Sequence, residues 1–198
     1  VATLGMMMVG SGLAYMLSGG LSIYQLPQSF DWLGRGDDLG GIPNAVVLMV
    51  VLYLLAHTLM SRTTLGRYIY AVGGNPEAAR LSGVPVKKIL LGVYASCGAL
   101  AGLGGVIMAS QFKSGDPKYG LMYELYVIAA VVVGGTSLSG GRGKVFGTLI
   151  GAFIIAVIQN GMNLTGVQSY TQKVVLGIVL LAAVLLDMLK KRGWKLSL

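Results

Sequence analysis

The organisation of this chain follows from the stretch Gly73-Gly74-Asn75-Pro76-Glu77-Ala78-Ala79-Arg80-Leu81-Ser82-Gly83, a short polar segment between two long apolar runs. Asn75 is a favourable N-cap, Pro76 suits the first helical turn, and Glu77 complements the positive end of the helix dipole. Gly83 can end the helix in a left-handed conformation. The stretch therefore predicts a helix of about two turns with a stop at each end.

Basic residues flank this predicted helix, with Arg62 and Arg67 before it and Lys87 and Lys88 after it. Basic loops between membrane spans stay on the cytoplasmic side. We therefore expect the helix to lie at the inner surface of a membrane, where a soluble partner can reach it. The residues alone also allow a plainer interpretation, in which the helix is only a turn that joins two spans.

The composition indicates an integral membrane protein. Of the 198 residues, 55% are hydrophobic and only 11% are charged, which is too apolar for a soluble domain of this size. The formal net charge of +8 comes from basic residues at the ends of apolar runs, so it indicates orientation in a membrane and not a nucleic-acid partner. Val1 stands where an initiator methionine would be, and we expect that an N-terminal part of the protein is missing.

Six apolar runs are candidates for membrane spans, because a helix needs about 20 apolar residues to cross a bilayer and fewer where neighbours shelter its ends. The runs are 2–18, 45–60, 89–110, 122–133, 145–160 and 174–188. We predict an all-helical (all-α) membrane protein with one transmembrane domain over 1–198. Residues 19–43, with Trp32 as an interfacial anchor, should form an exposed outer loop. The fourth run passes into the glycine-rich segment 134–144, which is typical of a transporter span broken where its backbone lines a cavity or turns sharply.

The basic residues also predict the orientation of the six spans. With the predicted helix inside, the inner side carries Arg62, Arg67, Arg80, Lys87, Lys88, Arg142, Lys144, Lys190, Lys191, Arg192 and Lys195. The outer side carries Arg35, Lys113, Lys118 and Lys173. This asymmetry favours a cytoplasmic C-terminus, since removing one span would place either the middle or the terminal basic cluster outside.

Two glycine patterns predict close contacts between helices, because small residues let backbones approach. Gly98 and Gly102 lie on one face of the third span. The second pattern is a stripe at four-residue spacing, formed by Gly143, Gly147 and Gly151. We expect Ile155, further along the same span, to face lipid instead.

The sequence lacks the patterns that catalysis or nucleotide binding would need. The segment that ends at Lys144 superficially resembles a phosphate-binding loop, but Leu138 stands where a glycine is needed and Val145 replaces the magnesium-holding Ser or Thr. His57 is the sole histidine and Cys97 the sole cysteine, so neither a histidine pair for a metal nor an internal disulfide can form. We therefore expect a non-catalytic chain that binds no cofactor or metal and takes its energy from a partner.

Several polar side chains in or near the spans are candidates to line a substrate path. They are Tyr94, Tyr123, Glu124, Tyr126, Gln159, Asn160 and Asn163. Amides and aromatic rings suit hydroxyl-rich ligands, but the same residues also hold helices together, so the pattern leaves both roles open. Glu124 lies near the start of a span, where water can solvate its charge.

The predicted helix is similar to the coupling motif in the membrane subunits of ABC importers, where a short cytoplasmic helix docks into a groove on the ATPase. The motif consists of Glu77-Ala78-Ala79, three further residues and Gly83. By this resemblance, the ATPase-coupling residues are Asn75, Pro76, Glu77, Ala78, Ala79, Arg80, Leu81, Ser82 and Gly83.

Other segments resemble the ribose/xylose-type permease family more specifically. They are LGRYIYAVGGN (65–75), AAVVVGGTSL (129–138) and GTLIGA (147–152), and the similarity extends over most of the chain from Gly34 onward. Tyr123-Glu124-Leu125 matches a recurrent Tyr-Glu-Leu of the family, although Tyr126 stands where the family usually has Asp. The chain looks like the C-terminal portion of these permeases.

The resemblance implies the transmembrane subunit of a bacterial ABC importer in the inner membrane, which translocates a ribose- or xylose-like monosaccharide. A cytoplasmic ATPase would bind ATP and Mg²⁺, a second and most simply identical permease subunit would complete the pore, and a periplasmic or lipid-anchored binding protein would deliver the sugar. Membrane lipid would surround the spans. The alternatives are a branched-chain amino-acid or nucleoside permease, and an ion-coupled secondary carrier, which would need ionisable residues deep in its spans.

Overall fold

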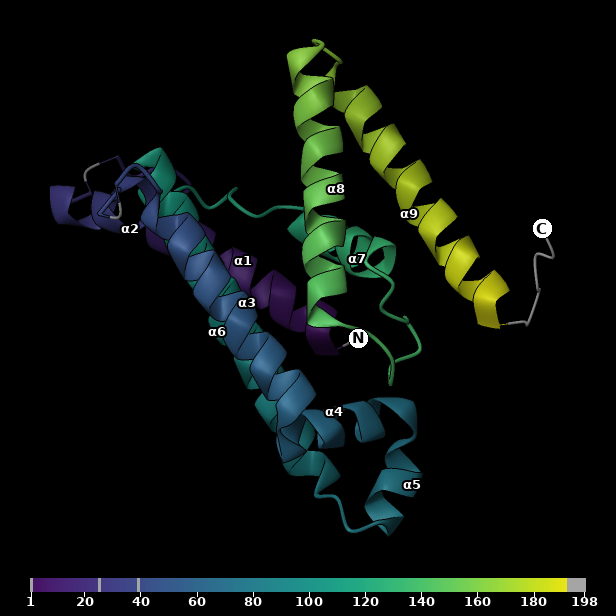
Figure 1. Ribbon diagram of the computed structural model, residues 1–198. Coiled ribbons are helices and arrows are strands. Elements are labelled where there is room, and N and C mark those ends of the chain that lie inside the picture. Colours follow the sequence, from purple (N-terminus) through teal and green to yellow (C-terminus); the bar gives the residue numbers. More distant parts are fainter. Residues whose placement is uncertain (1, 25, 39, 192–198) are drawn as a thin grey trace. The chain divides into compact units, whose positions relative to one another are not determined.

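The chain is all-helical in a computed structural model that describes residues 2–24, 26–38 and 40–191. The helices are α1 (Ala2–Ser18), η1 (Gln28–Phe30), α2 (Asp31–Arg35), α3 (Asn44–Arg62), α4 (Thr64–Gly74), α5 (Pro76–Leu81), α6 (Val86–Phe112), α7 (Tyr123–Val133), α8 (Val145–Leu164) and α9 (Ser169–Lys191) (Figure 1). Within these described ranges, β-type pairing is limited to an isolated bridge between Ile23 and Gly115. The predicted all-helical fold is confirmed.

Each predicted span corresponds to one of these helices. Four of them, α3, α6, α8 and α9, are long and apolar enough to cross a membrane by length and composition. The helices α1 and α7 are apolar but shorter, so the count of six spans stays a prediction. The four long helices are sufficient for a multi-pass membrane protein.

The helices group into two compact units. The first consists of Val1–Val51 and Ala95–Leu121, and the second of Leu52–Tyr94 and Met122–Leu198. Both α3 and α6 contribute a part to each unit. The second unit contains α4, α5, α7, α8 and α9, and with them nearly all the predicted site residues.

In the first unit, the segment between α1 and α3 is attached to the end of α6. The fully buried Ser110 donates a hydrogen bond from Oγ to the Phe30 carbonyl (2.6 Å) and accepts one from the Gly34 N–H (2.8 Å). The segment 19–43, predicted as an exposed loop, therefore contains two short helices and a buried glycine. Trp32 lies on its exposed side.

In the second unit, α7 packs against both α8 and α9. Figure 1 shows α8 and α9 meeting at the turn after Leu164 and diverging from there. Ala129, Ala130 and Ile155 form the buried core of this packing. Ile155 is only 5% exposed, so the prediction that it faces lipid is wrong. It lies four residues after Gly151, and this spacing keeps it on the helix face that α7 covers.

The glycine stripe at the start of α8 permits this close packing. A β-carbon on Gly147 would collide with the Gly134 carbonyl oxygen, and one on Gly151 would lie 2.8 Å from the Gly134 nitrogen. Gly143 precedes the helix, and a β-carbon there would lie 2.7 Å from the Thr136 side chain. The contact between α7 and α8 therefore depends on the absence of side chains at Gly147 and Gly151, whereas Gly143 lies against the loop that follows α7.

The glycines of α6 are in a different situation. Apart from their own helix, no atom of the described residues lies within 4 Å of a β-carbon built on Gly98 or Gly102. The described parts of the chain thus do not make the predicted contact, and packing against another helix stays a prediction. Many large apolar side chains of the long helices are likewise exposed, as expected where lipid or further helices cover them.

Candidate coupling site

The helix α5 begins with the cap that the sequence predicts. Asn75 has an extended backbone, and its side-chain oxygen accepts hydrogen bonds from the N–H groups of Glu77 and Ala78, both at 3.1 Å. Pro76 has no N–H to satisfy and occupies the first helical position. The start of this short helix is thus fixed by local sequence.

The same helix ends in a Schellman motif around Gly83. Gly83 has a φ of 81° and donates its N–H to the Arg80 carbonyl, while the Val84 N–H donates to the Ala79 carbonyl, both at 3.0 Å. Glycine is favoured here because a β-carbon is strained in the left-handed conformation. The predicted helix with a stop at each end is confirmed.

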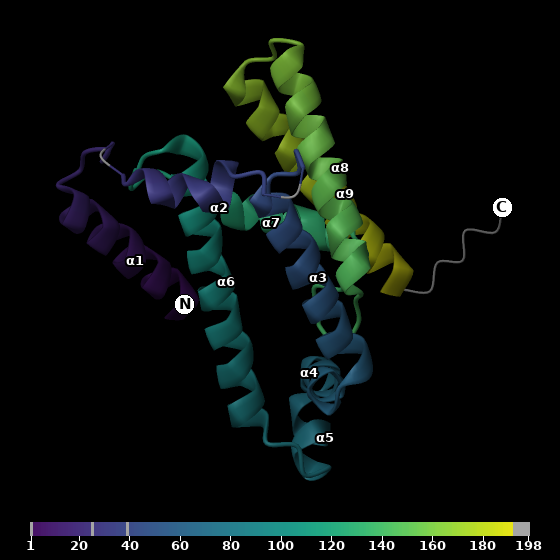
Figure 2. The same ribbon diagram turned by 60° about the vertical axis from the view of Figure 1, so that its left-hand side comes forward.

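An apolar cluster of the second unit supports α5 from one side. Ala79 of α5 is buried together with Val72 of α4 and Ile89 of α6, and Ile69 and Val84 pack against them. Figure 2 shows α4 and α5 as neighbouring short helices that follow the end of α3. The cluster gives α5 a fixed base, because its one buried side chain joins two other helices.

The opposite side of α5 is open to solvent. Glu77, Arg80, Leu81 and Ser82 are all exposed, and Leu81 is 82% exposed. Glu77 and Arg80 pair at 2.9 Å, but both side chains are mostly exposed, so the pair adds little stability. The helix therefore presents a mixed polar and apolar surface on a fixed base.

The glycine-rich segment 134–144 lies against α4. The Tyr70 hydroxyl donates a hydrogen bond to the Gly143 carbonyl at 2.8 Å. A β-carbon on Gly73 would lie 2.8 Å from the Gly141 nitrogen, so the two backbones touch. Figures 1 and 2 both show the loop between α7 and α8 reaching α4.

Sequence reasoning missed both α4 and this contact. The segment was expected to break a span, and α7 does end at Val133, but the segment also bridges α4 and the start of α8. One available signal was the pair of doublets Gly73-Gly74 and Gly140-Gly141, because glycine permits close backbone approach. Another was Thr63, whose Oγ1 caps α4 by accepting the Gly66 N–H at 3.2 Å.

Two of the predicted substrate-path residues line one small cavity. Tyr126 of α7 and Gln159 of α8 face a cavity of about 10 Å³, which α9 closes with Gln172 and apolar side chains. That volume holds about one water molecule and is too small for a sugar. Asn163 accepts a hydrogen bond from the Gln172 side chain at 2.9 Å, so these residues join α8 to α9.

The remaining substrate-path candidates do not line that cavity. Tyr94, Tyr123, Glu124 and Asn160 are exposed, and the ring of Tyr123 lies 5.9 Å from that of Tyr126. A role for any of these residues on a substrate path stays a prediction.

Metal ligands are not grouped in the part of the chain that the structure describes. There, no set of three His, Cys, Asp or Glu side chains is placed to hold an ion. His57 packs against Phe146, with ring centroids 4.6 Å apart, and Cys97 is an exposed free thiol.

The fold and the site together define a multi-pass helical membrane protein that presents a short, capped helix on a fixed base. The chain belongs to the family described as "Branched-chain amino acid transport system / permease component", whose family model matches residues 1–184. Individual relatives confirm the narrower resemblance to ribose-type ABC permeases.

Three relatives illustrate the extent of the similarity. The ribose import permease protein RbsC of Escherichia coli (strain K12) is 46% identical over 191 residues, which are 94% of this chain and 59% of the relative. RbsC of Bacillus subtilis (strain 168) is 47% identical over 189 residues, 94% of this chain and 58% of the relative. The L-arabinose transport system permease protein AraH of Escherichia coli (strain K12) is 39% identical over 193 residues, 98% of this chain and 58% of the relative. The chain therefore spans less than two thirds of these relatives, and no solved structure gives a significant match.

Proposed function

We propose that this chain forms the membrane-spanning part of a bacterial ABC importer that carries a monosaccharide across the inner membrane. The observation that carries the proposal is α5, which is capped at both ends, seated through Ala79 and exposed on its other side. Relatives named for ribose and L-arabinose support a pentose as the substrate. The chain itself would make or break no covalent bond, and a partner ATPase would bind ATP and Mg²⁺.

In this proposal, α5 transmits the movement of the ATPase to the spans. The apolar cluster around Ala79 connects α5 to α4. The hydrogen bond from Tyr70 to Gly143 connects α4 to the loop that leads into α8. Because α8 is packed closely on α7, a displacement of the loop would move both helices and favour alternating access of the substrate path.

The other parts of the transporter follow from the predicted orientation. Segment 19–43 would lie on the outer side, where a periplasmic or lipid-anchored binding protein delivers the sugar. A second permease subunit, most simply an identical copy, would cover exposed apolar faces and complete the pore. The small-residue face at Gly98 and Gly102 is available for such packing.

A branched-chain amino-acid permease is the second candidate, because the family description names that transport system. Uptake of labelled ribose and labelled leucine by the same reconstituted complex would separate the two substrates. An ion-coupled carrier is less well supported, since it needs ionisable groups deep in its spans. In the described part of the long and short apolar helices, the carboxylates are Glu124 in the first turn of α7 and Asp187 near the end of α9.

The test of the coupling role compares Gly83→Arg with Gly166→Arg. Both glycines have positive φ angles, 81° and 71°, and nothing in the described structure lies within 4 Å of a β-carbon at either. Both also end a helix in a Schellman motif, since the Val167 N–H donates to the Met162 carbonyl at 3.0 Å. The two substitutions therefore impose similar backbone strain, and only Gly83 lies on the proposed docking surface.

The full-length permease, its ATPase and its binding protein are purified together and reconstituted in proteoliposomes. Gly83→Arg should lower ATPase association by more than about tenfold, because disrupting a central interface residue commonly costs about 2 kcal/mol. It should also abolish sugar uptake, whereas Gly166→Arg should retain ATPase association. Normal uptake by the Gly83→Arg complex, or equal loss of ATPase from both variants, would refute the coupling role.

A further inference from the structure

The second unit contains a cavity beside the proposed coupling route, and the two share Tyr70. It has a volume of about 350 Å³, which lies within the range of small-ligand sites. It is lined by His57, Met60, Ser61, Tyr70, Lys144, Val145 and Phe146. These residues come from the last turns of α3, from α4 and from the start of α8, all within the second unit.

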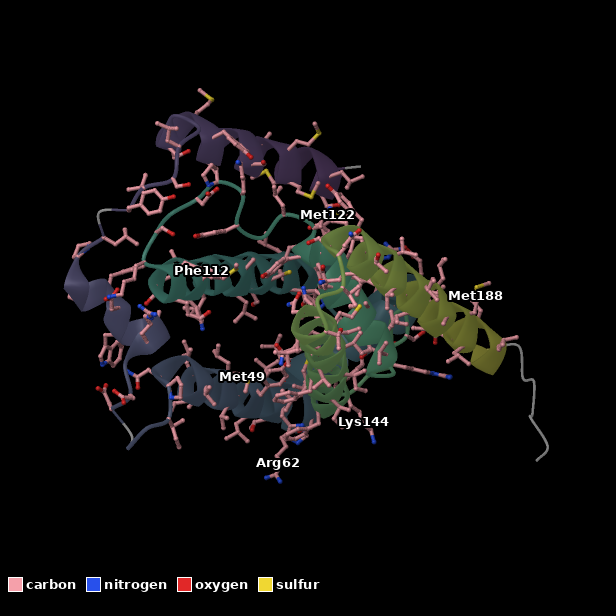
Figure 3. The ribbon with its side chains drawn as sticks, turned by 90° about the horizontal axis from the view of Figure 1, so that it is seen from above. Met49, Arg62, Phe112, Met122, Lys144 and Met188 are labelled. Carbon is pink, nitrogen blue, oxygen red and sulfur yellow. The ribbon has the colours of Figure 1, made fainter. Side chains whose placement is uncertain are left out.

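The charge of this cavity is positive. Lys144 lines it, and no carboxylate does. Lys144 forms no ion pair with any residue that the structure describes, and the same holds for Arg62 and Arg142, which follow or precede lining residues in the sequence. In Figure 3 the side chains of Arg62 and Lys144 both project outward at the same edge of the view. An anionic group in the cavity would therefore find Lys144 as a cationic partner without displacing a carboxylate.

The hydrogen-bond donors of the cavity that are still free also favour an anionic ligand. The hydroxyls of Ser61 and Tyr70 already donate their protons to the carbonyls of His57 (2.6 Å) and Gly143 (2.8 Å). These two oxygens can therefore only accept hydrogen bonds, and they do not bind an anion. The Lys144 ammonium and the His57 ring nitrogens have no hydrogen-bond partner among the described residues. The donors that remain for a ligand are thus concentrated around Lys144.

The rest of the lining is apolar. Met60, Val145 and Phe146 cover one part of the cavity, and Phe146 packs its ring against His57. A small hydrophilic anion would leave this part unused. A ligand that combines an anionic head with apolar chains would fill both parts.

The position of the cavity supports such a ligand. It lies at the end of α3 and at the beginning of α8, and both helices are long and apolar enough to cross the membrane. The ends of spanning helices lie at the level of the lipid headgroups. Basic pockets between spans on the cytoplasmic side are known to hold anionic headgroups. We propose that this cavity binds the phosphate headgroup of an anionic membrane phospholipid, with Lys144 as its main cationic contact.

A bound lipid would bridge α3, α4 and α8 beside the loop that crosses α4. The inference does not depend on which substrate is carried, and it would survive failure of the proposed sugar specificity. It requires only that the ends of α3 and α8 lie at one membrane surface, as the basic residues around them predict.

The first experiment measures lipid retained by the purified complete complex in native mass spectrometry after exposure to phosphatidylglycerol or phosphatidylcholine. The wild type should retain phosphatidylglycerol in preference. Lys144→Gln should lower this retention about fivefold, the fold-change that corresponds to roughly 1 kcal/mol for one basic residue near an anionic surface. Lys144→Arg should preserve it. The matched control is Lys87→Gln, an exposed lysine outside the cavity, which should have little effect.

The second experiment identifies the occupant directly. A photo-crosslinking residue in place of Met60 should capture phospholipid in the complete complex in native membranes. Capture of the ATPase or of a second copy of this chain at that position would overturn the proposal. So would equal loss of phosphatidylglycerol from the Lys144→Gln and Lys87→Gln complexes, no preference over phosphatidylcholine, or displacement of the lipid by inorganic phosphate alone.

Discussion

The packing of α8 against α7 can be tested by placing one methyl group at Gly151. A β-carbon there would collide with the Ala130 carbonyl oxygen and would lie 2.8 Å from the Gly134 nitrogen. Gly134 donates its N–H to Ala130 at 2.9 Å, so both obstacles are backbone groups in the last turn of α7 that cannot rotate away. Ordinary contacts of a β-carbon begin near 3.4 Å, so Gly151→Ala requires the two helices to separate by about 0.6 Å or more.

The matched control is Gly161→Ala on the same helix. Apart from that helix, no described atom lies within 4 Å of a β-carbon at Gly161. Both substitutions gain about 1 kcal/mol of helix propensity, and this gain cancels when the two variants are compared. The difference between them isolates the steric cost at Gly151, about 1 to 3 kcal/mol for an overpacked site.

The assay is thermal unfolding of the two full-length variants in the same detergent, followed by tryptophan fluorescence. A change of 1 kcal/mol shifts the melting temperature of a chain of about 150 to 250 residues by about 2 to 4 °C, and that of a longer chain by less. Gly151→Ala should therefore melt measurably below Gly161→Ala, by at most about 12 °C. Equal melting temperatures would refute the packing of α8 on α7 through the glycine stripe.

Three further predictions concern orientation, pH and coupling. In a cysteine-free background, Arg35→Cys should react with an impermeant thiol reagent added to intact cells and Arg80→Cys should not; labelling of the latter from outside would contradict the predicted topology. The Ser22 hydroxyl, 2.6 Å from Asp116, is the main cause that lowers the pKa of this carboxyl, so the contribution of Asp116 to stability is present above its ordinary pKa and is lost as the pH falls through the lowered pKa. Ser22→Ala should bring the pKa of Asp116 closer to its ordinary value and reduce the difference in melting temperature between pH 7 and about pH 2, which lies well below the ordinary pKa; an unchanged difference would contradict the role of the Ser22 hydrogen bond. Tyr70→Phe removes a hydrogen bond worth about 1 kcal/mol and should lower sugar transported per ATP hydrolysed without lowering ATPase association; an unchanged ratio would contradict the transmission route through α4.

The sequence alone was sufficient for features whose causes are local. Both ends of α5 were predictable, because Asn75 caps through N–H groups two and three residues away and Gly83 supplies its own left-handed turn. The long apolar runs likewise predicted α3, α6, α8 and α9, since length and composition determine which helices can cross a bilayer.

Features that depend on distant contacts were not predictable in the same way. The bond from Tyr70 to Gly143 joins residues 73 positions apart, and nothing local to either specifies it. The helix α4 was not predicted from the sequence, because α4 has one apolar and one polar side and a search for continuous apolar runs does not detect such a helix. The wrong prediction that Ile155 faces lipid has another origin. Its four-residue spacing from Gly151 places it on the same helix face as the glycine stripe, but the prediction applied this periodicity to the glycines alone.

The contacts in the second unit indicate that α4 is the element on which the proposed functions converge. Its Val72 packs against Ala79 of α5, and its Tyr70 reaches the loop before α8. The same Tyr70 lines the cavity that contains Lys144. A movement of α5 that displaces α4 must therefore alter either the contact with the loop or the shape of the cavity. An anionic lipid held there would influence how tightly α4 and α8 are connected, and thereby how efficiently the movement of a partner reaches the membrane spans.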